Sequence, residues 1–183
     1  RLRDVIRLTY ILVDAWMDSY PREPASVTLD IDDTCDTVHG HQQLSLFNAH
    51  YDERCFLPIH IYDAASGKPV AMILREGKTP SGEEVRTVLK HVIKRIRRHW
   101  PKVHILVRGD SHYARDEAMQ WCEETQGVDY VFGFAGNDVL HAVGPAEPLE
   151  AVVITGMSLD EAEVGAAAER VHRPHVELVV RGE

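Results

Sequence analysis

Two acidic strand ends stand out in this sequence as places where chemistry could occur. One is Leu29-Asp-Ile-Asp-Asp-Thr34 and the other is Val107-Arg-Gly-Asp-Ser111, and each ends a β-branched or aliphatic run. Hard divalent cations such as Mg²⁺ prefer carboxylate oxygens, and when bound they activate nucleophiles and stabilise leaving oxygens in phosphodiester chemistry. Two carboxylates from distant strands can share a metal only if the fold lays those strands side by side. We predict Asp32 and Asp110 as this catalytic, metal-binding pair.

Three acids compete for the first of these two positions. Asp30 and Asp32 share one face of an alternating strand, and Ile31 between them points into the core. Asp33 would face away or begin the loop. Asp32 is nearer the strand end, where ligands collect, so we prefer it. One alternative stays open: these acids are ordinary turn residues, or they keep the strand ends soluble.

Other polar residues surround the two acids in the sequence. Arg108 and His112 flank Asp110 and could touch a scissile phosphate; equally, Arg108 could pair with an acid for structural reasons. His39-Gly40-His41 could bind a metal, but no further Cys or His follows at zinc-like spacing, so hydrogen-bonding loop histidines are favoured. Asp36 could orient the loop. The residues predicted to support the ligands are Asp30, Asp33, Thr34, Asp36, His39 and His41.

Length and composition limit the class of protein. With 183 residues, 44% of them apolar, the chain can form one medium domain, or one domain with a tail. No run of eighteen apolar residues exists, so we expect no membrane span. Three widely spaced cysteines favour a reducing cytoplasm over a disulfide framework. The chain starts without Met or a signal peptide, so we expect the middle of a longer protein.

The net charge of −9 is unfavourable for binding nucleic acid, but the charge is uneven. A basic stripe at 90–102 can neutralise phosphates even when the whole chain is acidic. We predict DNA contacts from Lys94, Arg97 and Arg98; the alternative is that the stripe is an ordinary solvated helix face. Its members are Lys90, His91, Lys94, Arg95, Arg97, Arg98, His99 and Lys102.

Hydrophobic periodicity predicts alternating strands and helices. Strands are expected at 27–32, 55–62, 70–75, 103–107 and 129–134, and residues 33–54 are expected to be irregular. Helices are expected at 2–17, from Ser81 to Trp100 behind a Ser81/Glu84 capping box, and at 114–122. This order predicts an α/β, ribonuclease-H-like mixed sheet, in which a three-strand antiparallel meander is joined by two parallel strands and flanked by helices. The first and fourth strands are then neighbours, so Asp32 and Asp110 can converge.

We divide the chain into three parts. Residues 1–22 are a helix leading into the core, 23–143 the partial catalytic core, and 144–183 a divergent acidic tail. The tail pattern favours a strand at Val152–Thr155 and a helix after Ser158. The last Lys in the chain is Lys102 and the last Tyr is Tyr130.

Over residues 1–140 the sequence resembles the DDE transposases of bacterial insertion sequences, in the group whose first motif reads LDxDxTxDxxHGHQ. The segments that carry the likeness are Leu29–Gln42, Tyr51–Pro58, Arg108–Tyr113 and Asp129–Gly133. The resemblance implies a cut-and-paste enzyme that uses Mg²⁺, with Mn²⁺ as a substitute. It also implies a homodimer of the full-length enzyme that binds the terminal repeats in double-stranded DNA. The D-x-T and R-G-D contexts of the family support Asp32 and Asp110 as its first two acids.

The chain departs from the family at its end. The family's third acid is a Glu in a Tyr-x2-Arg-x3-Glu-x6-Lys arrangement, and no Tyr follows 130 and no Lys follows 102. We therefore expect a truncated or frameshifted core that is impaired in strand transfer and incomplete at its C-terminus. Two alternatives stay open: a non-catalytic remnant that binds DNA or full-length transposase, and a stand-alone metal-dependent nuclease that uses Glu163 or Glu169.

Overall fold

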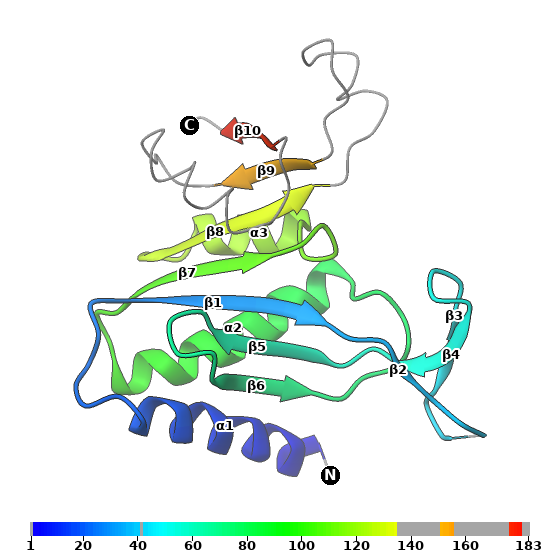
Figure 1. Cartoon of the computed structure of the whole chain (residues 1–183). Coiled ribbons are helices and arrows are strands. Elements are labelled where there is room, and N and C mark those ends of the chain that lie inside the picture. Colours follow the sequence, from blue (N-terminus) through cyan, green and yellow to red (C-terminus); the bar gives the residue numbers. More distant parts are fainter. Residues whose placement is uncertain (1, 41, 135–150, 156–175, 181–183) are drawn as a thin grey trace.

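The computed structural model of this protein describes residues 2–40, 42–134, 151–155 and 176–180, which form a seven-stranded sheet, a three-stranded sheet and three helices (Figure 1). The helices are α1 (Leu2–Asp18), α2 (Gly82–His99) and α3 (Asp116–Glu123). The large sheet contains β1 (Ser26–Asp33), β5 (Ile59–Asp63), β6 (Pro69–Ile73), β7 (His104–Gly109), β8 (Val128–Phe134), β9 (Ala151–Thr155) and β10 (Val176–Val180). The small sheet contains β2 (Asp36–Thr37), β3 (Leu46–Asn48) and β4 (Glu53–Phe56). No helix in the described ranges is long and apolar enough to span a membrane.

The large sheet has the predicted mixed topology. Its strand order is β10-β9-β8-β7-β1-β5-β6. Strands β1, β5 and β6 form the antiparallel meander, and β7 and β8 add in parallel beside β1. Strand β9 then pairs antiparallel with β8, and β10 pairs parallel with β9. The strand expected at 152–155 is therefore present as β9, while the helix expected after Ser158 lies outside the described residues.

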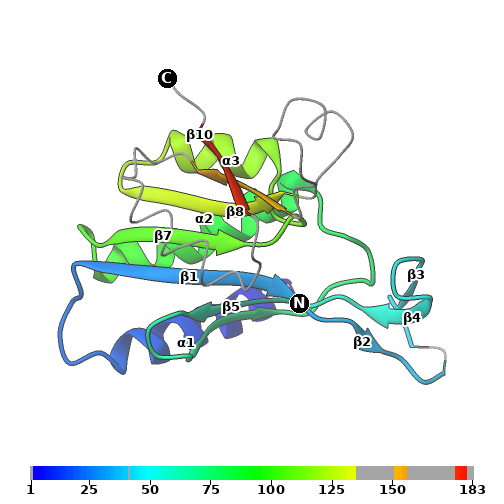
Figure 2. The same cartoon turned by 45° about the horizontal axis from the view of Figure 1, so that its top comes forward.

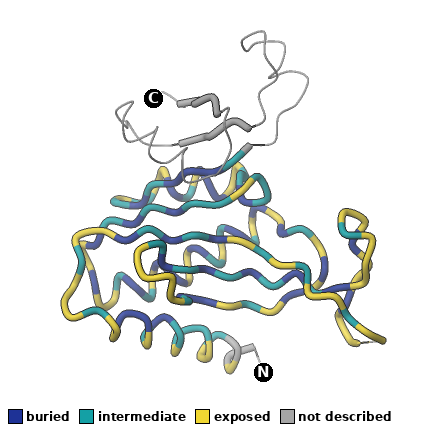
Figure 3. The backbone as a smooth tube through the Cα atoms, viewed as in Figure 1, coloured by how far each residue is buried: buried dark blue, intermediate teal, exposed yellow. Residues whose placement is uncertain are grey.

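One face of the large sheet carries the hydrophobic core. Alternate residues of β1, namely Val27, Leu29 and Ile31, are buried with the apolar residues of the helices, which cover this face (Figure 1, Figure 3). The intervening residues of β1 point to the opposite face and are less buried. The predicted alternation is confirmed: Asp30 and Asp32 share the second face.

Helix α2 begins where the capping-box pattern predicted. The Ser81 side chain accepts a hydrogen bond from the backbone N–H of Glu84, which satisfies one of the orphan donors of the first turn. The Glu84 carboxylate does not complete a reciprocal box, because it pairs with Arg75 instead. At the other end, Trp100 packs edge-on against Trp16 with ring centroids 5.3 Å apart, so α1 and α2 are joined by aromatic contacts.

The segment 33–62 differs from the prediction in two respects. Residues 33–54 were expected to be irregular, but they contribute β2, β3 and the start of β4 to the small sheet, which projects beyond the end of β1 (Figure 1, Figure 2). The single strand expected at 55–62 is two strands in different sheets, β4 and β5, separated by Leu57 and Pro58. Pro58 has no N–H to donate to a ladder, which favours a break at this point.

Candidate active site

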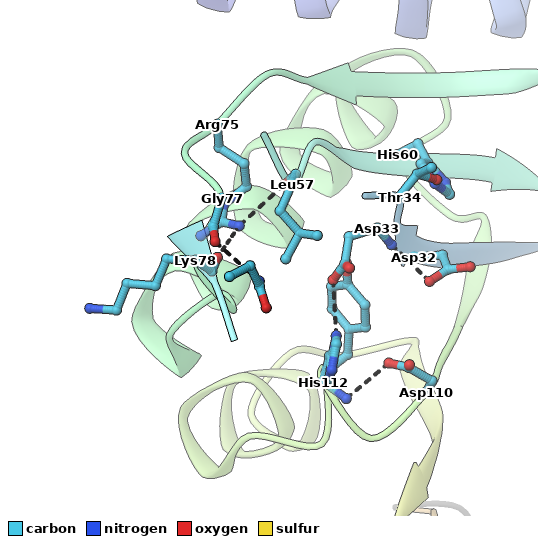
Figure 4. Close-up of polar contacts among 12 residues, drawn as sticks. Asp32, Asp33, Thr34, Leu57, His60, Arg75, Gly77, Lys78, Asp110 and His112 are labelled. Carbon is cyan, nitrogen blue, oxygen red and sulfur yellow. Dashed lines mark hydrogen bonds and ion pairs between the residues drawn. The ribbon is translucent and has the colours of Figure 1, made fainter. Parts of the chain in front are cut away.

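The ends of β1 and β7 bring Asp32 and Asp110 together. The two strands pair in parallel, and the last pair in their register is Ile31 with Gly109. Asp32 and Asp110 are the next residues on each strand, so both carboxylates lie at the same edge of the sheet (Figure 4). Adjacent parallel strands are 4.7–4.9 Å apart, roughly the span that one cation between two carboxylates requires.

Gly109 makes this close approach possible. A Cβ at position 109 would lie 3.0 Å from Ile31 Cγ2 and 3.1 Å from both the Ile31 carbonyl oxygen and Tyr113 Cβ. Two of these three atoms belong to the neighbouring strand, and the third belongs to a buried tyrosine. Glycine before Asp110 therefore allows β7 and the turn after it to pack tightly against β1.

The electrostatics of the pair suit a cation. Partial desolvation raises the pKa of Asp32, and the negative charge of Asp110 raises it further, while a hydrogen bond from the Asp33 N–H acts in the opposite direction. Asp32 Oδ1 accepts that bond at 2.7 Å, and Asp110 Oδ1 accepts one from the His112 N–H at 2.9 Å. Among the described residues, no Lys or Arg forms an ion pair with either carboxylate. The repulsion between the two acids is thus not offset by an ion pair with a described Lys or Arg.

Asp33 joins the two strand ends from the other side of the sheet. Its side chain is 2% exposed, and Oδ2 accepts a hydrogen bond from the Tyr113 hydroxyl at 3.1 Å and contacts His112 Nδ1 at 3.2 Å. Asp33 adjoins Asp32 in sequence, and His112 and Tyr113 closely follow Asp110. This buried cluster therefore fixes the turn that carries Asp110 relative to the end of β1 (Figure 4).

On the sheet face that points away from the helices, a bidentate ion pair links β1 and β7 beside the site. Arg108 Nε lies 2.7 Å from Asp30 Oδ1, and Nη2 lies 2.8 Å from Oδ2. The residues are directly paired in the strand register. Of the two roles that the sequence left open for Arg108, this geometry supports pairing with an acid, and the pair neutralises Asp30. Asp32 is left as the acid of this face nearest Asp110.

The second strand of the meander, β5, contributes His60, which lies opposite Asp32 in the register of β1 and β5. Its Nε2 is 2.8 Å from the Thr34 hydroxyl, and its positive field when protonated would favour an ionised Asp32. Sequence reasoning did not single out His60, Tyr113 or Arg75. For His60, the sequence did contain a signal. It alternates with the core residues Ile59 and Ile61, which places it on the same face of the sheet as Asp32.

The remaining predicted residues are spread over other parts of the molecule. Asp36 is exposed on β2 and His39 is exposed in the loop after it, while His41 lies outside the described residues. Arg97 Nη2 donates to the carbonyls of Gln126 and Gly127 and so ties α2 to the turn before β8. Lys94 and Arg98 are exposed on α2.

The described residues offer a metal two carboxylates. They contain no group of three or more His, Cys, Asp or Glu side chains arranged to hold a metal ion. Glu163 and Glu169, considered as substitutes for a third acid, lie outside the described residues. Asp32 and Asp110 fit a divalent cation because both are oxygen ligands, repel each other and lack a cationic partner in the described chain.

This chain is similar to one protein family and to two solved structures. A family model described as transposase DDE domain, group 1, matches residues 2–164. The chain is similar in structure to piggyBac transposase in a synaptic complex with hairpin DNA, at 11% identity over 70% of this chain and 27% of that chain, with a TM-score of 0.50. A second similar structure is Mos1 transposase in a paired-end complex with the left transposon end, at 13% identity over 68% of this chain and 40% of that chain, with a TM-score of 0.38.

At these identities the piggyBac likeness shows a shared fold. This chain spans about a quarter of the piggyBac chain and less than half of the Mos1 chain. A comparison with curated protein sequences found no match.

Proposed function

Because the chain belongs to the family of transposase DDE domains, group 1, we propose that it is the metal-binding core of an enzyme that cleaves and joins DNA at insertion-sequence ends. The observation that carries this proposal is the register of β1 and β7, which places Asp32 and Asp110 side by side at one sheet edge. Membership of the family implies a divalent metal. We propose Mg²⁺, with Mn²⁺ as a substitute.

In this proposal Asp32 and Asp110 hold the cation, which when bound would activate a nucleophile and stabilise the leaving oxygen of a phosphodiester. The protein supplies the fixed geometry. The backbone N–H groups of Asp33 and His112 each hold one carboxylate oxygen, and the buried Asp33 cluster holds the turn after β7. The Asp30–Arg108 pair keeps a third acid on the same face neutralised, so that it does not compete for the cation.

Two protein ligands bind a hard cation more weakly than three, so we propose that strand transfer by this chain is impaired. The sequence lacks the family's third acid in its expected arrangement. Binding of terminal repeats in double-stranded DNA, by a homodimer of the full-length enzyme, is part of the same proposal. The hairpin DNA in the synaptic complex of the piggyBac transposase supports it by analogy of fold.

The first experiment measures Mn²⁺ binding by calorimetry and Mn²⁺-dependent nicking of supercoiled plasmid by the 183-residue chain. Asp32→Asn and Asp110→Asn should each weaken Mn²⁺ binding by about tenfold or more, since loss of a ligand costs at least as much as loss of a residue that supports one. Both should abolish nicking. Asp52→Asn, an exposed residue with φ 52° in the turn before β4, removes the same charge and should change neither quantity.

The outcomes separate the alternatives. Nicking that survives in Asp32→Asn would show that other residues hold the metal. Mn²⁺ binding that requires both aspartates, without any nicking by the unmodified chain, would identify a non-catalytic remnant that retains its metal site. Absence of Mn²⁺ binding to the unmodified chain would remove the metal site itself.

A further inference from the structure

Helix α2 exposes a row of basic residues that the candidate active site does not use. Lys90, Lys94 and Arg98 follow one another at intervals of four residues, and Lys102 comes after them in the turn beyond the helix. All four are exposed. We call Lys90, Lys94 and Arg98 the basic row.

The basic row points away from the protein core. The buried residues of α2 include Val85, Leu89 and Ile96, which form one stripe against the sheet. Lys94 is nine residues after Val85, about two and a half turns at 3.6 residues per turn, so it lies on the opposite side of the helix. Lys90 and Arg98 lie about 40° to either side of it. The row is thus the centre of the exposed face of α2.

The other cations of the stripe are already engaged. Arg95 binds Asp14 of α1 through two hydrogen bonds, and Arg97 donates to backbone carbonyls around Gly127. Arg86 pairs with Glu83 one turn earlier. By contrast, Lys90, Lys94 and Arg98 have no ion pair or hydrogen bond from their side chains within the described chain.

Such a row has an energetic cost. Like charges four residues apart destabilise a helix by about 0.2–0.5 kcal/mol per pair. Helix α3, which packs beside α2, exposes acids instead, namely Asp116, Glu117 and Glu123.

The row is separated from the candidate active site. Helix α2 ends at His99, and its cap Trp100 leads to the edge where β1 and β7 begin, since the His104 N–H bonds the Ala25 carbonyl there. Arg98 is the member of the row nearest this edge, and Asp32 is six residues beyond the start of β1, which is about 20 Å at 3.3 Å per residue. The two surfaces also lie on opposite sides of the sheet, because Asp32 points away from the helices.

We propose that the basic row binds the phosphate backbone of a DNA duplex, at a segment remote from the phosphate that is cut. Lys90 to Arg98 spans about 12 Å along the helix, the length of about three to four phosphates of one strand at 3.4 Å each. The contact is electrostatic and does not depend on base sequence. It rests on the proposed function only in that the chain acts on DNA.

The test is binding of the full 183-residue chain to a 40-base-pair duplex of mixed sequence, measured by fluorescence anisotropy between 50 and 200 mM salt with EDTA present. Lys94→Gln combined with Arg98→Gln should weaken binding at 50 mM salt by about tenfold, and should reduce the slope of log K against log salt by about 2. Exchanging the two residues, Lys94→Arg with Arg98→Lys, keeps both charges and should restore binding.

The matched control removes two exposed positive charges elsewhere, with Arg22→Gln and Lys68→Gln. Equal weakening by the control would show an effect of net charge and would overturn the proposal, as would unchanged binding in the row variant or no binding by the unmodified chain. The row variant, Lys94→Gln with Arg98→Gln, should bind Mn²⁺ in calorimetry as the unmodified chain does, because the row lies on the helix face opposite the sheet. Failure of the metal site and failure of the basic row are therefore observed separately.

Discussion

The position of Asp32 beside Asp110 has a cost in stability. Its pKa is raised by partial desolvation and by the nearby Asp110 carboxylate. A group whose pKa is higher in the folded than in the unfolded state stabilises the fold at low pH, and this contribution is lost as the pH rises through the folded pKa. At neutral pH and without metal, the charge on Asp32 therefore disfavours folding.

Asp32→Asn should consequently raise the melting temperature in EDTA at pH 7.5. The gain should shrink as the pH falls towards 4, because Asp32 then takes up its proton and the repulsion disappears. Addition of Mn²⁺ should raise the melting temperature of the unmodified chain more than that of the variant. Thermal unfolding followed by circular dichroism across this pH range checks the result, and a lower melting temperature for Asp32→Asn at pH 7.5 would contradict it.

Helix α2 connects the meander to β7, so its ends decide where Asp110 is placed. Its N-terminus is capped by Ser81, and acidic residues in the first turn and basic residues in the last turn complement the helix dipole. Its C-terminus is fixed by the Trp100 N–H, which donates to the Ile96 carbonyl, and by the aromatic contact with Trp16. The helix thus starts and stops at positions set by local chemistry.

Ser81→Ala should lower the free energy of unfolding by about 1 kcal/mol, the usual cost of losing a side-chain cap. Urea denaturation measures this loss. Thr87→Ala, at an exposed position within the same helix, should be neutral or slightly stabilising because alanine has the higher helix propensity. If both variants lose stability equally, the cap is not the cause.

At the level of the whole molecule, Arg75 holds the small sheet against the large one. Its side chain is 6% exposed, pairs with Glu84 of α2, and donates through Nη1 to the carbonyls of Leu57 and Lys78. The neighbouring Gly77 carbonyl accepts a hydrogen bond from the Asn48 side chain of β3. One buried guanidinium therefore joins α2 to the segment that leads from β4 to β5 and to the loop between β6 and α2.

Arg75→Met should destabilise the protein by about 3 kcal/mol, since it leaves buried carbonyls without a donor and breaks an ion pair whose arginine side is buried. Hydrogen exchange should show β4 losing protection more than β7. Arg86→Met is the matched control: its pair with Glu83 is exposed on both sides and is worth no more than about 0.5 kcal/mol. Comparable losses in the two variants would show that Arg75 does not join the sheets.

Local patterns in the sequence were sufficient for much of the fold. The strand alternation around Ile31, the cap at Ser81 and the order of strands and helices depend on neighbouring residues, and the predicted mixed sheet is confirmed. The predicted family is confirmed by the match over residues 2–164. The roles of Asp32 and Asp110 stay predictions, although the structure places the two residues at adjacent strand ends.

The rest was decided by contacts between residues far apart in the chain. The pairing of Arg108 with Asp30, the burial of Asp33 under Tyr113 and the small sheet after β1 all depend on partners that periodicity does not identify. The alternating pattern of a strand predicts which face of the sheet a residue occupies. It does not predict which side chain lies opposite, because the opposing side chain depends on strand register and loop geometry. The sequence alone therefore determined the order of the main strands and helices, the family and the candidate acids. Only the tertiary structure decided which charges are paired and how the segment after β1 folds, because both depend on contacts between distant residues.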